Sequence, residues 1–300
     1  MRHRSKIRNT LEYLLALVIL STLEFTPRFF AEKLARFYIR LIDLAVPRLR
    51  RTAMRNLEMA LPELSGELRE EIVEGVFRSL ARRLLTLARL PRINRNNISR
   101  WIRLEGFENF EKAMAKGRGV LVATAHLGDW ELSAHAHALL SGPMYVVVRP
   151  LDNPWLDRLV ERRRTLAGNR IIDKKQFARG ILKALSANQA VGILIDQNTS
   201  ADQGVFVDFF GIPACSHAGL PRLAAHSGAP VIAGFALWDE QEKRYVLRFY
   251  PEIPMSGDIR ADAARLQSFL EDIIRRHPEQ WLWVHRRWKT RPPGQPPLYP

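Results

Sequence analysis

Four short apolar runs constrain the fold of this chain more than any other feature. They are Gly119–Ala125, Met144–Val148, Val191–Ile195 and Val231–Leu237. Nearly uninterrupted apolar runs of this length are typical of strands that are buried on both faces, as in a parallel sheet. We therefore predict an α/β fold with a mostly parallel central sheet flanked by helices.

Helical patterns separate these runs, and the alternation of strand and helix implies right-handed βαβ units. The predicted helices are Glu131–Leu140, Trp155–Leu166, Phe177–Ala187, Ala218–His226 and Ala261–His277, together with helices within residues 50–95. The alternating segment Arg244–Pro251 is predicted to be an edge strand and Trp281–His285 a last strand. Arg291–Pro300 is too rich in proline for regular structure.

Residues 1–48 are predicted to be a membrane-associated helical unit that precedes an α/β domain of residues 49–300. Met1–Asn9 is basic, and Leu11–Phe25 is apolar. A cleaved signal peptide is disfavoured because no small-x-small cleavage site follows. The uninterrupted apolar stretch between Glu12 and Glu24 is shorter than the ~20 residues that cross a bilayer.

The segment Phe29–Ala45 is predicted to be a basic amphipathic helix. Its apolar residues at helical spacing are Phe30, Leu34, Phe37, Leu41 and Leu44, with Lys33, Arg36 and Arg40 between them. Such a helix can lie in an anionic membrane interface, or it can face the core of a soluble domain. We expect an anchor at the cytoplasmic leaflet, through a short span or a shallow insertion.

The charge of the chain restricts its partners. The formal net charge is +15, and arginine supplies most of the excess. So basic a protein binds polyanions such as nucleic acid, anionic lipid, a phosphorylated substrate or an acidic carrier protein. No helix-turn-helix, zinc or RNA-binding signature supports nucleic acid. The single cysteine, Cys215, excludes an internal disulfide and a cysteine-only metal site.

The strongest candidate for chemistry is His126, which ends the first apolar run, together with Glu131 five residues later. Ligands of open α/β sheets bind outside the carboxyl ends of the strands. Asp129 is a suitable N-cap for the following helix, and Glu131 falls in its first turn. A carboxylate on one ring nitrogen would fix the tautomer, so that the other nitrogen takes a proton from an attacking hydroxyl. The alternative is a histidine with a purely structural hydrogen bond, and spacing alone supports both interpretations equally.

Two other kinds of site are disfavoured. The sequence has no Gly-x-Ser-x-Gly elbow, which argues against a serine hydrolase. His126, Glu131 and His135 do not have the His-Glu-x-x-His spacing of zinc proteases. We therefore expect no catalytic metal.

The segment His126–Glu131 resembles the His-x4-Asp/Glu signature of glycerolipid and lipid A acyltransferases. Further matching segments follow in order: Val148–Pro150, Asp196–Gln197, Val205–Gly211, Ala225–Val231 and Pro278–Lys289. Together they resemble the late acyltransferases of lipid A biosynthesis, the lauroyl/myristoyl type of Gram-negative inner membranes. The resemblance covers nearly the whole chain, and the C-terminal block is its most specific part.

This resemblance implies an O-acyltransferase at the cytoplasmic face of the inner membrane. The expected donor is a fatty acyl chain on acyl carrier protein, and the expected acceptor is a hydroxyl of a phosphorylated glycolipid, the lipid A precursor. His126 and Glu131 would catalyse the transfer without a covalent enzyme intermediate, and no cofactor is implied. The alternative acceptor is another glycolipid, a phospholipid or an aminolipid.

The remaining candidates are cations and strand-end polar residues. Arg149 and Arg164 are candidates for stabilising the oxyanion of the transition state. The candidates for substrate binding are Asp129, Arg162, Arg163, Asp196, Gln197, Arg286 and Arg287. Arg170, Lys174 and Lys175 extend the basic surface, and Phe206, Phe209 and Phe210 either wall an acyl tunnel or pack in the core.

Overall fold

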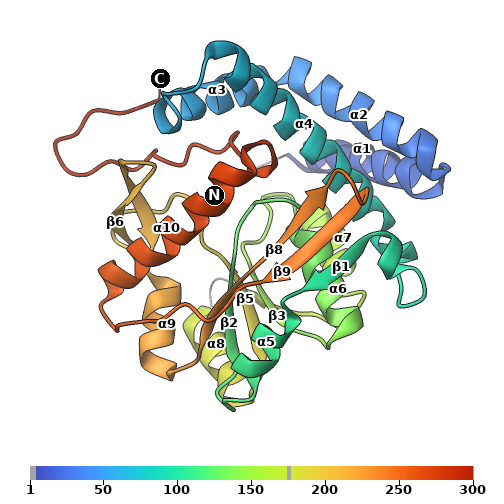
Figure 1. Ribbon diagram of the computed structural model, residues 1–300. Helices are drawn as coiled ribbons and strands as arrows, with labels where there is room; N and C mark the ends of the chain where they lie inside the picture. Colours follow the sequence, from blue (N-terminus) through green and yellow to red (C-terminus); the bar gives the residue numbers. More distant parts are fainter. Residues whose placement is uncertain (1–4, 174–176, 300) are drawn as a thin grey trace.

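A mixed sheet forms the centre of the computed structural model, which describes residues 5–173 and 177–299 (Figure 1). Within these residues its strand order is β1-β9-β8-β2-β5-β3-β4. The strands are β1 (Ile102–Glu105), β2 (Val120–Thr124), β3 (Tyr145–Val148), β4 (Arg170–Asp173), β5 (Ala190–Leu194), β8 (Val231–Asp239) and β9 (Arg244–Phe249). Strand β9 runs antiparallel to β8, and the pairs on either side of that junction are parallel. The predicted α/β fold with a mostly parallel sheet is confirmed.

Helices cover both faces of this sheet. Helices α5 (Phe107–Met114) and α6 (Trp130–Leu140) lie on one face, and α8 (Phe177–Ser186), α9 (Gly219–Ser227) and α10 (Ile259–Arg276) lie on the other (Figure 1). Alternate residues of β2 belong to different cores, since Val120 and Val122 pack with α5 and α6 whereas Leu121 and Ala123 pack with α8 to α10. Burial on both faces explains why these strands are continuously apolar.

The predicted last strand at Trp281–His285 is wrong. The chain there follows a 3-10 turn at Pro278–Gln280 and makes only an isolated bridge between Trp281 and Leu127. Its strand-like alternation has another cause, because Trp281, Trp283 and Trp288 all anchor this irregular segment in the core. The predicted edge strand at Arg244–Pro251 is β9, although β1 covers its outer side.

An antiparallel hairpin of β6 (Gly204–Phe209) and β7 (Ile212–His217) packs against α10. Phe209 and Phe210 are buried there against Trp281 and its neighbouring indoles. Phe206 instead lines a separate depression beside the start of α10. The hypothesis that these phenylalanines wall an acyl tunnel is therefore not supported, and Phe209 and Phe210 serve as core.

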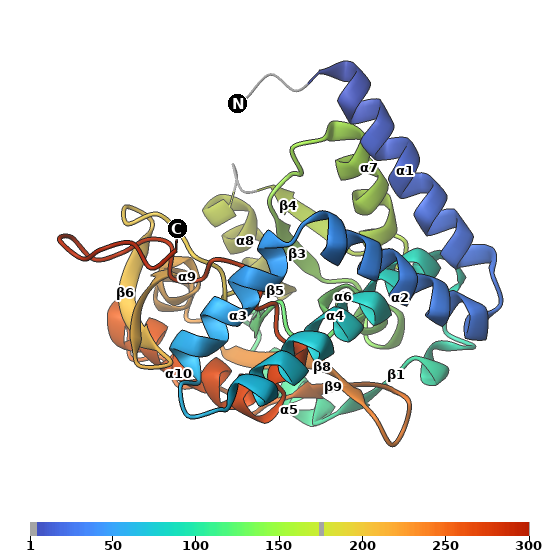
Figure 2. The same ribbon diagram turned by 90° about the horizontal axis from the view of Figure 1, so that it is seen from above.

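Four helices precede the sheet. They are α1 (Lys6–Phe25), α2 (Arg28–Ala45), α3 (Arg48–Ala60) and α4 (Gly66–Arg89). Helices α1 and α2 lie across α4 (Figure 2), where Leu20, Leu23, Ala31 and Ala35 pack on Ala81, Leu85 and Ala88. Helix α7 (Pro154–Arg164) contacts α1, and the carboxylate of Glu24 pairs with Arg163 at 3.3 Å. Helices α1 and α2 are thus attached to the rest of the molecule by specific contacts.

The amphipathic character of α2 is confirmed, and its large apolar residues face outward. Phe30, Phe37, Leu41 and Leu44 are exposed, with Phe37 at 55%, while the small residues Ala31 and Ala35 face α4. None of the helices in the described ranges combines the length and the apolar character that crossing a bilayer requires. Membrane contact of this surface stays a prediction.

Candidate active site

A tight turn carries His126 from the end of β2 into α6. Gly128 in this turn has a φ of 63°, and a Cβ there would collide with the carbonyl of Ala236. Asp129 then caps α6, because its Oδ1 accepts a hydrogen bond from the Leu132 N–H at 2.9 Å. The predicted N-cap is confirmed, and the turn fixes His126 at the carboxyl edge of the sheet.

The imidazole of His126 is held by Asp196, not by Glu131. Its Nδ1 lies 2.9 Å from Oδ1 of Asp196, and the His126 backbone N–H donates to Oδ2 of the same carboxylate at 2.9 Å. Asp196 follows β5, which is the parallel neighbour of β2, and its side chain is buried. Two adjacent strand ends therefore bring together a histidine and an aspartate that are seventy residues apart in the chain.

The C-terminal segment completes this arrangement. The indole N–H of Trp281 donates to Oδ2 of Asp196 at 2.9 Å, and the Leu282 N–H donates to the carbonyl of His126 at 3.0 Å. Burial by itself would raise the pKa of Asp196, but the charge of His126 and these hydrogen bonds lower it to about 2. The carboxylate is therefore ionised at any physiological pH and orients the imidazole.

His126, with its Nε2 not engaged by Asp196, lines an open groove. The groove has a volume of about 500 Å³ and is lined by His126, Trp130, Arg149, Arg164 and Gln197, among others. The side-chain nitrogen of Gln197 lies 3.4 Å from Nε2. With Nδ1 held by Asp196, Nε2 is the nitrogen available to take a proton from a bound hydroxyl.

Glu131 does not contact the imidazole through a hydrogen bond among the described residues; its carboxylate binds Arg164 at the end of α7. The Nε of Arg164 lies 2.9 Å from Oε2, and its Nη2 lies 2.5 Å from Oε1 of this carboxylate. Burial opposes the charge of Arg164, but the hydrogen bonds and charge of Glu131 raise the pKa of the guanidinium above its usual value. Arg164 is thus a fixed cation beside the groove.

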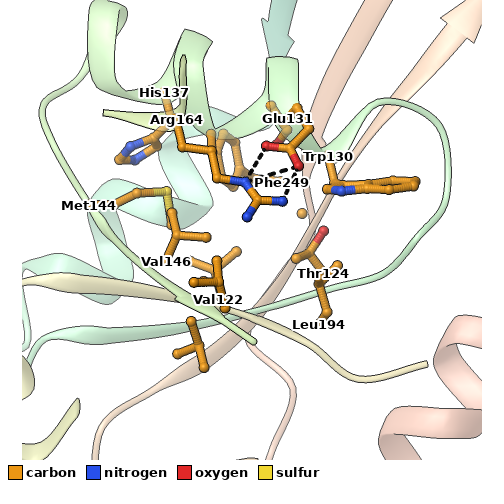
Figure 3. A pocket seen from close by; sticks show the side chains of 16 residues that line it. Val122, Thr124, Trp130, Glu131, His137, Met144, Val146, Arg164, Leu194 and Phe249 are labelled. Atoms are coloured by element: carbon orange, nitrogen blue, oxygen red, sulfur yellow. Dashed lines mark hydrogen bonds and ion pairs between the residues drawn. The ribbon is translucent and has the colours of Figure 1, made fainter. Parts of the chain in front are cut away.

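An apolar cavity lies beside this ion pair (Figure 3). Val122, Met144, Val146, Leu194 and Phe249 are part of its wall, and Glu131 and Arg164 stand together at one side of it. Trp130 and Arg164 line both this cavity and the groove of His126. An apolar ligand in the cavity therefore lies next to the charged groups.

Trp130 also braces the histidine. Its ring packs edge-to-face on His126, with centroids 4.6 Å apart, and the guanidinium carbon of Arg83 lies 3.6 Å from the Trp130 ring centroid. Burial lowers the pKa of Arg83 to about 10, so Arg83 remains charged at neutral pH. Trp130 and Arg83 were not among the predicted site residues, since aromatic and basic residues on helices have no distinctive spacing.

Of four other predicted site residues, only Arg149 lines the groove of His126. Arg149 lies on the groove rim, 76% exposed, and Arg162 is exposed on α7. Arg163 is buried on Glu24, away from the groove. Asp129 is buried under α6, where burial raises its pKa to about 6. It does not line the groove, so a substrate contact is not supported.

Arg286 and Arg287 both contact other residues of the protein. Arg287 is fully buried. Its guanidinium donates hydrogen bonds to the carbonyl of Cys215 at 3.0 Å, to Oγ of Ser216 and to Oε1 of Gln267. Arg286 lies over the Tyr299 ring. Substrate binding by Arg287 is therefore corrected to a role in holding β7 and α10. Arg170 is exposed, and Lys174 and Lys175 lie outside the described residues.

No group of three or more histidine, cysteine, aspartate or glutamate side chains within the described ranges is arranged to hold a metal ion. His135, next to the site in sequence, is buried and bonds to the carbonyl of Ile93.

By fold and site the molecule is an α/β protein in which a strand-end histidine, hydrogen-bonded to a buried carboxylate, lies near an apolar cavity. Comparison with known proteins makes this specific. The family described as bacterial lipid A biosynthesis acyltransferase matches residues 1–290. The chain therefore belongs to this family.

Relatives with curated names agree. The chain is 32% identical over 251 residues to a lipid A biosynthesis palmitoleoyltransferase of Escherichia coli (strain K12), covering 82% of this chain and 81% of the relative. It is 32% identical over 248 residues to a lipid A biosynthesis lauroyltransferase of the same organism, covering 82% and 80%. A myristoyltransferase of that organism is 25% identical over 250 residues, covering 82% and 77%.

Proposed function

We propose that this protein transfers a fatty acyl chain from acyl carrier protein to a hydroxyl of a lipid A precursor. The observation that carries the proposal is the pairing of His126, which lines the groove, with the buried Asp196, which does not engage Nε2. Membership of the family supplies the acyl transfer, and the names of the relatives supply the lipid A acceptor.

The proposed reaction needs one base. As the acceptor oxygen attacks the thioester carbonyl, its proton moves to Nε2 of His126, and the carbonyl oxygen becomes an oxyanion. The intermediate collapses, the carbon–sulfur bond breaks, and the imidazolium returns the proton to the departing thiolate. Asp196 holds the Nδ1–H and stabilises the imidazolium while it exists. No covalent intermediate forms on the enzyme.

Arg164 is the proposed oxyanion partner. The carboxylate of Glu131 engages its Nε and Nη2, so the position of the guanidinium is fixed before substrate binds. A preorganised donor at the developing charge typically contributes ~3–4 kcal/mol to a barrier reduction. In this scheme Glu131 acts through Arg164, and Arg149 on the rim contacts the polar part of a substrate.

The apolar cavity, about 60 Å³ in volume, is the proposed place where an acyl chain enters the protein interior. Its wall is formed by aliphatic and aromatic side chains from β2, β3, β5, β9 and α6. An acyl chain in the cavity would place its carbonyl beside Arg164 and within reach of the groove. Binding of the long chain by apolar burial leaves the reacting atoms to be positioned by the polar groups.

The outward apolar faces of α1 and α2 are the proposed contact with the cytoplasmic leaflet of the inner membrane. Exposed phenylalanines alternate there with the basic residues Lys33, Arg36 and Arg40. This combination favours shallow insertion into an anionic interface. The acceptor lipid would then reach the groove from the membrane surface.

Mass spectrometry of lipid A from cells that lack this protein tests the proposal. We expect loss of one secondary acyl chain, restored by the wild-type gene and not by His126→Ala. Unchanged lipid A with a change in another glycolipid, a phospholipid or an aminolipid would instead identify a different acceptor. Full complementation by His126→Ala would refute the mechanism.

A further inference from the structure

A polar cavity whose lining shares no residue with the groove of His126 is not used by the proposed reaction. Its volume is about 330 Å³, at the lower end of the ~300–1,000 Å³ typical of small-ligand pockets. The elements that line it are α2, α4, the β8–β9 turn and the segment before β1. Its polar and aromatic lining consists of Arg28, Glu32, Arg36, Arg82, Thr86, Trp101, Trp238, Glu240, Lys243 and Tyr245.

The cavity has an excess of positive charge. Four cations and two carboxylates line it, which leaves a net charge of +2. Glu32 pairs with Arg28 at 3.2 Å, and Glu240 pairs with Lys243 at 3.0 Å and with Arg82. Arg36 has no carboxylate within ion-pair distance among the described residues, so an anion can bind there without displacing an internal partner.

Two of the cations are held in place by aromatic rings. The guanidinium carbon of Arg28 lies 4.6 Å from the Trp101 ring centroid, and that of Arg82 lies 4.6 Å from the Trp238 ring centroid. Stacking of this kind restricts the rotamers of arginine and leaves its edge N–H groups for an oxyanion. The cations are therefore partly preorganised.

A buried hydroxyl provides an independent observation. Tyr245 lines the cavity, is 1% exposed, and its Oη has no hydrogen-bond partner among the described residues. A buried hydroxyl without a partner destabilises a protein unless a bound group satisfies it. An anionic oxygen is the acceptor that the surrounding cations would bring to it.

We propose that this cavity binds a phosphate group carried by a membrane lipid. A phosphate offers several acceptor oxygens and a charge that matches the excess of the cavity. The same helix that contributes Arg28 and Arg36 exposes Phe29 and Phe37 beside them, so the cavity adjoins the apolar face of α2. This inference relies on the proposed membrane contact of α2, and it adds a second contact point at a distance from His126.

Vesicle flotation of the full-length protein tests the assignment. The vesicles are phosphatidylcholine alone, phosphatidylcholine with phosphatidylglycerol, and phosphatidylcholine with the phosphorylated lipid A precursor, at one ionic strength. Arg36→Gln is expected to weaken binding to the phosphate-bearing vesicles about fivefold. Arg78→Gln is the matched control, because Arg78 is exposed on α4 and does not line the cavity.

Tyr245→Phe distinguishes specific recognition of the phosphate group from general electrostatic attraction, since this substitution changes no charge. We expect a loss of binding of about fivefold, with a melting temperature that is unchanged or higher because a buried hydroxyl is removed. A loss confined to precursor vesicles would identify the acceptor as the ligand, and a loss on both kinds of vesicle would identify an anionic phospholipid.

Three results would overturn the assignment. They are equal losses for Arg36→Gln and Arg78→Gln, unchanged binding by Tyr245→Phe, or an effect confined to the KM for the acyl carrier. Acyl-transfer activity of the wild-type protein is measured in parallel. If the wild type transfers no acyl chain but flotation changes as expected, the proposed function fails and the phosphate site stands.

Discussion

Substitution of Asp196 by asparagine tests the orientation of the imidazole most directly. The carboxylate accepts from Nδ1 of His126 and from the indole of Trp281, both at 2.9 Å. An amide of the same shape donates one of these hydrogen bonds instead of accepting it, which favours the tautomer with a proton on Nε2. That tautomer cannot act as the base.

The size of the effect follows from two contributions. Lowering of the Asp196 pKa from 3.8 to about 2 corresponds to ~2.5 kcal/mol of net stabilisation of the ionised carboxylate, or ~60-fold. The wrong tautomer adds to this, and the equivalent change in a Ser-His-Asp triad lowers kcat ~10⁴-fold. We therefore expect Asp196→Asn to lower kcat by ~10³–10⁴, with a small change in KM.

The assay is mass-spectrometric acyl transfer by purified protein, with circular dichroism to verify folding. Asp208→Asn, at an exposed position of β6, is the matched control. Glu131→Gln keeps an acceptor for Arg164 and should cost less than Asp196→Asn. The reverse order, with Asp196→Asn within tenfold of wild type, would show that Glu131 orients the imidazole during turnover and would refute the reasoning.

Three further predictions concern the surroundings of the site. Arg164→Gln should lower kcat ~10²–10³-fold, whereas Arg163→Gln should mainly lower the melting temperature by breaking the pair with Glu24; equal kinetic losses would contradict this. Asp129 has a folded-state pKa of about 6, above its usual value of 3.8, so stability should fall by ~2–3 kcal/mol as the pH rises between those values. Asp129→Asn keeps the cap and should abolish that fall in urea unfolding measured across this range; an unchanged slope would count against the assignment. Gly128→Ala should destabilise the fold by at least ~3 kcal/mol in thermal unfolding, and a normal melting temperature would show that the turn can relax.

Local pattern was sufficient for much of the fold. Strands β2, β3, β5 and β8 correspond to the four apolar runs. Strands β2, β5 and β8 are almost entirely buried, whereas β3 is half-buried and lines the apolar cavity. Strands β1 and β4 were not predicted, since two of the four residues in each are charged and interrupt the apolar pattern. The segment at Trp281 was predicted as a strand because its alternation matches that of strands, although the structure uses it to anchor a loop.

The carboxylate that orients His126 could not be identified from the sequence. Glu131 was the obvious partner for His126 because it is near in sequence and in the first turn of the helix. The helix carries Glu131 toward Arg164 instead, and Asp196 approaches from the adjacent strand end. The available signal was that both Asp196 and His126 end apolar runs, but the order of strands in the sheet was unknown.

The sequence by itself determined the class of fold, the family and the histidine at the strand end, because these depend on residue type and on spacing along the chain. Only the tertiary structure decided which carboxylate orients His126, which arginine stands beside the groove, and that Arg287 is a core residue. The physical reason is that hydrogen bonds and ion pairs depend on distances of a few ångströms. Strand order and helix packing set those distances, and neither is encoded in local spacing.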